Sequence, residues 1–139
     1  MNRIQFIRFW SIAVGAMDAC TGMLLIFTPA QVLALLQIPP IGNESMLFLR
    51  WIGVFVAGVG LSYLFALGRR GQGEMIWYAT ALIRAMVAVF LTTSTLTGEM
   101  PMAWLAVAIA DALVAVIQVA IIRAGWWAEF RHLSAKRRL

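Results

Sequence analysis

The sequence has little of what most catalytic and redox sites are made from. Its 139 residues include one cysteine, Cys20, and one histidine, His132. A single cysteine excludes an internal disulfide and the paired-cysteine motif of membrane thiol-redox enzymes. We expect no metal site, because carboxylates without histidine or cysteine partners bind transition metals poorly. Phosphate loops, nucleophile elbows and dinucleotide fingerprints are absent, so we expect no cofactor.

Charged residues are also scarce, and apolar residues fill their place. Charged residues make up 12% of the chain and apolar residues 63%, with a mean hydropathy of +0.88. Soluble domains average about 25% charged and roughly 45–50% apolar residues, so this composition favours a membrane protein. Its length allows one domain, residues 1–139.

Four apolar runs of 19 to 22 residues cover most of the chain, at 9–27, 46–67, 75–96 and 102–122. About 20 apolar residues in a helix cross the hydrocarbon core of a bilayer. The sequence therefore predicts an all-α, integral membrane four-helix bundle followed by a basic tail, 123–139.

The connection between the first two runs has a pattern of its own. Thr28 is suited to an N-cap and Pro29 to the first helical position, and Pro39 and Pro40 end the segment. Apolar residues between them alternate with small or polar ones over too few positions to span a membrane. We expect a short interfacial helix between the first two spans.

The positions of the basic residues predict the orientation of the chain. Nine of the eleven Lys and Arg residues flank the runs on one side: Arg3, Arg8, Arg69, Arg70, Arg123, Arg131, Lys136, Arg137 and Arg138. The connections on the other side, 28–45 and 97–101, carry only Glu44 and Glu99 as charges. Basic residues favour the cytoplasmic side, so both termini should be cytoplasmic. The basic tail then lies near anionic lipid head groups, and no nucleic-acid partner is expected.

Each apolar run contains one charged residue: Asp18, Arg50, Arg84 and Asp111. A charge near the bilayer centre costs about 2.5 kcal/mol or more, so such residues usually face the bundle interior and pair there. Two acids and two bases sum to zero. The order along the chain suggests one pair between the first two spans, Asp18 with Arg50, and another between the last two, Arg84 with Asp111. Arg50 is only four residues inside the outer end of its run, so an outward, snorkelling position is also open.

Helical periodicity places each charge on a face with small or polar residues, as close helix packing in lipid requires. The four faces are Ser11, Gly15, Asp18, Thr21 and Gly22; Arg50, Gly53, Ala57 and Gly60; Trp77, Ala81, Arg84, Ala88 and Thr95; and Trp104, Ala108, Asp111, Ala115 and Gln118. We therefore expect Asp18, Arg50, Arg84, Asp111 and Gln118 to form a ligand site. Buried pairs that only fix helix register, or a charge-conducting route, are the alternatives.

Short motifs give the chain a resemblance to a known group of families. They are Phe27-Thr28-Pro29, Leu36-Gln37-Ile38-Pro39, Leu49-Arg50-Trp51-Ile52-Gly53 and Gly58-Val59-Gly60. This pattern resembles the small bacterial four-helix membrane families grouped as DoxX-like. The resemblance implies the same fold in a bacterial inner membrane, and a quinone or another membrane-soluble ligand. It carries over no redox activity, because the chain lacks the cysteine pair or histidine cluster that such chemistry needs.

Three functional hypotheses follow from these observations. The first is a binding module for a small amphiphile, lipid or quinone at the charged residues. The second is an accessory or assembly subunit that binds another membrane protein or a second copy, with purely structural charges. The third is a small membrane enzyme with Asp18 or Asp111 as general acid or base. A cavity of about 300 Å³ or more beside the charges would favour the first or the third.

Overall fold

A computed structural model describes residues 2–68 and 72–128 of the chain. It contains five helices in these ranges: α1 (Arg3–Phe27), α2 (Pro29–Leu35), α3 (Asn43–Ala66), α4 (Gly73–Leu96) and α5 (Trp104–Arg123). Four of them, α1, α3, α4 and α5, are long and apolar enough to cross a membrane. The predicted helical membrane bundle is therefore confirmed, and so is the short helix between the first two spans.

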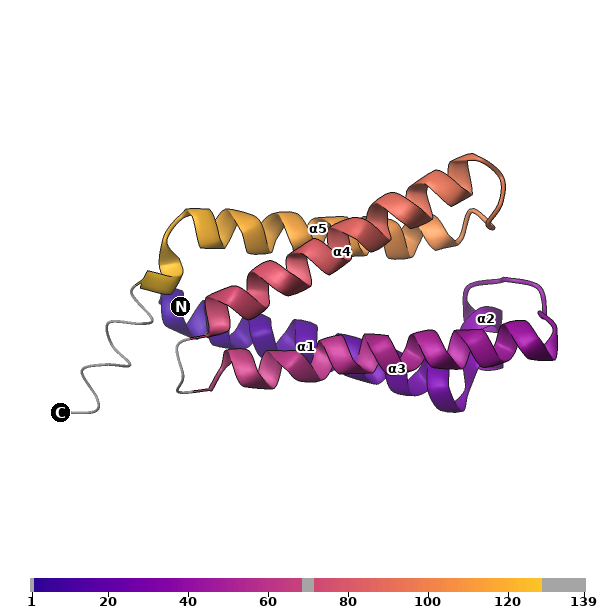
Figure 1. Cartoon of the computed structure of the whole chain (residues 1–139), viewed down its shortest axis with the longest axis horizontal. Coiled ribbons are helices and arrows are strands. Elements are labelled where there is room, and N and C mark those ends of the chain that lie inside the picture. Colours follow the sequence, from indigo (N-terminus) through magenta and orange to yellow (C-terminus); the bar gives the residue numbers. More distant parts are fainter. Residues whose placement is uncertain (1, 69–71, 129–139) are drawn as a thin grey trace.

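Local sequence explains where the helices begin. α1 starts six residues before the apolar run, because Asn2 and Gln5 form a reciprocal capping box at its first turn. α2 begins at Pro29, as predicted, and ends at Leu35. It packs beside α1 and α3 at the end of the molecule opposite the N-terminus (Figure 1).

Glycines set how closely α1 and α3 approach. Gly15 packs against Gly60, and Gly22 packs against Gly53. A Cβ atom added at Gly22 would lie 2.4 Å from the backbone nitrogen of Ala57, too close for any side chain. The two pairs share a spacing of seven residues on each helix. They lock the antiparallel register of the α1–α3 hairpin, as small residues do between helices in lipid.

The second hairpin, α4 and α5, lies over the first (Figure 1). The hairpins meet at the end that holds the N-terminus, and α4 is inclined so that its far end leaves α3. Small residues again face inward: Ala81 and Ala88 on α4, and Ala108 and Ala115 on α5, are buried.

An aromatic core joins the two hairpins where they meet. Trp77 of α4 is wholly buried, and its Nε1 donates a 3.0 Å hydrogen bond to Ser11 Oγ of α1. The ring of Trp127 packs edge-on against Trp77, with centroids 5.3 Å apart. Large apolar side chains cover the outside instead, among them Phe9, Phe65 and Phe90, each more than half exposed. This inverted distribution fits a chain surrounded by lipid.

Candidate functional site

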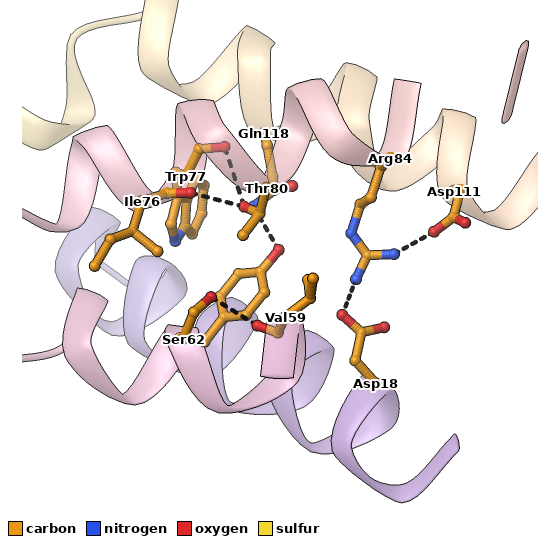
Figure 2. Close-up of polar contacts among 10 residues, drawn as sticks. Asp18, Val59, Ser62, Ile76, Trp77, Thr80, Arg84, Asp111 and Gln118 are labelled. Atoms are coloured by element: carbon orange, nitrogen blue, oxygen red, sulfur yellow. Dashed lines mark hydrogen bonds and ion pairs between the residues drawn. The ribbon is translucent and has the colours of Figure 1, made fainter. Parts of the chain in front are cut away.

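The centre of the bundle holds a cluster of three charges, which we name the Asp–Arg–Asp cluster (Figure 2). Arg84 of α4 is 4% exposed. Its Nη2 donates a hydrogen bond to Asp18 Oδ2 of α1, and its Nη1 donates one to Asp111 Oδ1 of α5. Both contacts are also ion pairs. Arg84 thus binds one acid within its own hairpin and one across the interface between hairpins.

The helical faces that hold these residues are largely the predicted ones. On α4, Trp77, Ala81, Ala88 and Thr95 are buried together with Arg84. On α1, Ser11, Gly15 and Gly22 are buried with Asp18, whereas Thr21 is exposed. On α5, Ala108, Ala115 and Gln118 are buried, and Asp111 is partly buried. The small residues leave the room that the charged side chains need.

One predicted pair, Asp18 with Arg50, is wrong. Arg50 is exposed, and Asp18 pairs with Arg84 instead. The glycine contacts explain the difference. Asp18 lies beside Gly60 of antiparallel α3, because a Cβ atom added at Gly60 would lie 2.9 Å from the Cβ atom of Asp18. Gly60 is ten residues from Arg50, roughly 15 Å along the helix. The other predicted pair, Arg84 with Asp111, is confirmed.

Because Arg50 lies outside the cluster, the net charge of the cluster differs from the predicted one. Two carboxylates and one guanidinium sum to −1, not to the zero that four paired charges would give. Arg84 binds one oxygen of each carboxylate and leaves the second oxygen of each without that partner. The side chain of Asp111 is the more accessible of the two acids, at 17% exposed against 9% for Asp18.

A second set of polar groups, which we name the polar network, adjoins the cluster. Gln118 is wholly buried, and its Nε2 donates hydrogen bonds to Tyr63 Oη at 2.9 Å and Thr80 Oγ1 at 3.4 Å. Thr80 in turn donates to the carbonyl oxygens of Ile76 and Trp77 (Figure 2). Gln118 was predicted as a site residue, whereas Tyr63 and Thr80 were not. Their helical spacing gave the signal, because Tyr63 follows Gly60 by three residues and Thr80 precedes Arg84 by four.

Two buried atoms of this interior lack hydrogen-bond partners among the described residues. They are the Nε of Arg84 and the Oε1 of Gln118. Tyr63 lies close enough to Arg84 to interact with it electrostatically, so the polar network adjoins the cluster on the side of α3. Buried polar atoms without partners are uncommon, and those of a native protein often mark a bound water, ion or ligand.

A groove of about 410 Å³ runs between α3 and α4. The residues that line it are Val54, Phe55, Gly58, Val59, Ser62, Ile76, Ala79, Thr80 and Ile83. The wall is apolar except for the hydroxyls of Ser62 and Thr80. None of Asp18, Arg84 and Asp111 lines this α3–α4 groove, but Thr80 belongs both to its wall and to the polar network.

Within residues 2–68 and 72–128, no three His, Cys, Asp or Glu side chains lie close enough to hold a metal ion. Comparison with protein-family models, with curated proteins and with solved structures found no match. The DoxX-like resemblance therefore stays a prediction. The fold and the buried cluster define the class: a helical membrane protein with an intramembrane ion-pair site.

Proposed function

We propose that this membrane protein binds a small amphiphile, of lipid or quinone type, in the α3–α4 groove. The observation that carries the proposal is the groove itself, with its volume of about 410 Å³ and its apolar wall. Ligand sites typically occupy about 300–1,000 Å³ and combine apolar walls with a few oriented polar groups. The groove lies one helical turn from Arg84, through Thr80, rather than at the charges.

The wall chemistry narrows the head group of the ligand. No charged side chain lines the groove, so an uncharged head group fits it best. The Ser62 hydroxyl donates to the carbonyl oxygen of Val59 at 2.7 Å and keeps free lone pairs for a ligand hydroxyl. The same hydroxyl can turn to donate to a quinone carbonyl. Gln118 contributes indirectly, because its hydrogen bond helps to hold Thr80 in place.

Gly58 offers a direct way to fill the groove. A Cβ atom added there meets nothing within 4 Å, so the wall of the groove has room for the start of a larger side chain. Gly58→Leu should reduce the bound amphiphile, measured by mass spectrometry of lipids and quinones that co-purify in nanodiscs. Gly58→Ala is the control for the change from glycine. Ala85→Leu introduces the same side chain at an exposed position of α4 outside the groove.

We expect one lipid or quinone to co-purify with the wild type, with Gly58→Ala and with Ala85→Leu. The same molecule should be missing from Gly58→Leu. A titration with a short-chain benzoquinone, followed by quenching of tryptophan fluorescence, should weaken in Gly58→Leu alone. Identical bound species and identical titrations in all four proteins would overturn the proposal.

A second candidate function is that of an accessory or assembly subunit for another membrane protein or a second copy of this chain. The contacts of Arg84 favour this second function, because Asp18 and Asp111 already bind both terminal nitrogens of its guanidinium. Such a cluster can serve only to hold helices together. The triple variant Asp18→Leu, Arg84→Met, Asp111→Leu would then keep the fold and the bound species. All three residues must change, since any one left alone would be a buried unpaired charge.

Three further parts of the proposal rest on the sequence: the membrane that holds the protein, its orientation and an enzymatic activity. A bacterial inner membrane with cytoplasmic termini accounts for the one-sided basic segments. An enzyme that uses Asp18 or Asp111 as general acid or base stays a prediction. Asp111, with the more exposed side chain, is the better placed of the two to meet a substrate.

A further inference from the structure

The charge of the buried cluster does not balance. Each helix that packs around it contributes one titratable or charged group: Asp18 from α1, Tyr63 from α3, Arg84 from α4 and Asp111 from α5. With both acids ionised, one negative charge is left over inside the membrane. An uncompensated charge there costs about 2.5 kcal/mol or more.

We propose that the Asp–Arg–Asp cluster binds one monovalent cation, a proton or an alkali-metal ion. The ligand brings the cluster to neutrality and occupies the carboxylate oxygens that Arg84 leaves unbound. A single guanidinium holds both carboxylates, so the two acids titrate as one unit rather than as independent groups. The site does not depend on the α3–α4 groove, which none of these residues lines.

The excess of acids over bases supports a cation rather than an anion. Gln118, two helical turns from Asp111 on α5, is wholly buried and its Oε1 has no donor among the described residues. The interior therefore has acceptor oxygens open to a ligand at Asp18, Asp111 and Gln118, beside one buried donor without a partner, the Nε of Arg84. An anion would add to the excess negative charge, whereas a cation or proton supplies what these oxygens lack. The partly exposed carboxylate of Asp111 gives the ligand its entry.

The sequence makes the site directly observable. Asp18 and Asp111 are the only aspartates in the chain; the other four acidic residues are glutamates. Protein labelled with ¹³C at the aspartate side-chain carboxyl therefore reports this cluster alone, without any substitution. Infrared spectra of the wild type in nanodiscs at neutral pH should show the carbonyl stretch of a protonated carboxylic acid. The band should shift on ¹³C labelling and in D₂O. Freely solvated carboxyls are ionised at this pH and do not contribute.

A second arm distinguishes the alkali ion from the proton. Thermal unfolding is followed in NaCl, in KCl and in N-methylglucamine chloride at equal ionic strength, for the wild type and for Asp111→Asn. Glu99→Gln removes an exposed carboxylate and serves as the matched control. A bound alkali ion should raise the unfolding temperature in a saturable way in the wild type and in Glu99→Gln, but not in Asp111→Asn.

The two arms together decide the proposal. An aspartate-specific carboxylic-acid band identifies the ligand as a proton. A spectrum without the band, combined with ion-specific stabilisation that Asp111→Asn abolishes, identifies an alkali ion. Absence of both overturns the proposal and leaves the cluster with its negative charge. Loss of folding in Asp111→Asn would not affect the infrared arm or the salt series on the wild type.

Discussion

Replacing Arg84 with methionine should destabilise the fold by about 3–5 kcal/mol, more than replacing either of its acids. The reason is that Arg84 is the shared partner of Asp18 and Asp111. Its loss leaves two buried carboxylates of like charge with no cation between them. The hydrogen bonds give a similar figure, since each bond to a charged group contributes about 1.5–3 kcal/mol and two are lost.

Changing one acid is a smaller perturbation. Asp18→Asn keeps the size of the side chain and an acceptor oxygen, and it leaves Arg84 paired with Asp111 as a neutral unit. The expected loss is about 0.5–1.5 kcal/mol, the usual net contribution of one hydrogen bond. Arg50→Met makes the same chemical change as Arg84→Met at an exposed arginine and should cost less than about 0.5 kcal/mol.

The measurement is chemical unfolding in mixed micelles, followed by circular dichroism, with all variants compared at one pH and one salt concentration. The predicted order of destabilisation is Arg84→Met, then Asp18→Asn, then Arg50→Met. Equal losses for Arg84→Met and Asp18→Asn would show that Arg84 is not a shared partner. A large loss of stability in Arg50→Met would instead support the pair of Asp18 with Arg50 that the order along the chain suggested.

Three further outcomes are expected. Reporter fusions after Leu139 and within 41–45 should report opposite compartments, the former cytoplasmic, as the one-sided basic residues require; the same compartment for both would contradict the four-span topology. Gly22→Ala should lower the free energy of unfolding by about 1–3 kcal/mol, because its Cβ atom would lie 2.4 Å from the backbone of α3. Gly58→Ala should cause no such loss, because its Cβ atom would meet no neighbour within 4 Å. Ser11→Ala should cost about 1–3 kcal/mol in the same unfolding assay, since it leaves the buried α4 indole nitrogen without its acceptor.

Much of the fold follows from patterns that sequence displays directly. The length of the four apolar runs predicts the spans, and Thr28 with Pro29 predicts the start of α2. The small residues that share a helical face with Arg84 and with Asp111 predict that both point inward at one depth. These are local properties, because each depends only on the periodicity of a single helix.

The partner of Asp18 depends on how two helices align, and that alignment is not a property of either helix alone. Two alanines or glycines can meet in several registers, and charge counting favours whichever pair makes the sum zero. The groove and the polar network are likewise products of packing. Tyr63 and Thr80 meet Gln118 only because α4 is inclined across α5 and α3, which no single-helix pattern specifies.

The sequence does hold a clue to the register of α1 and α3. Gly15 and Gly22 are seven residues apart, and so are Gly53 and Gly60, the spacing that lets two antiparallel helices meet at two points. In that alignment Asp18 lies beside Gly60, ten residues further into the membrane than Arg50. The same alignment then removes Arg50 from the cluster and leaves two acids with one base. The close packing of four glycines, rather than the number of charges, therefore determines that the cluster contains two acids for one base.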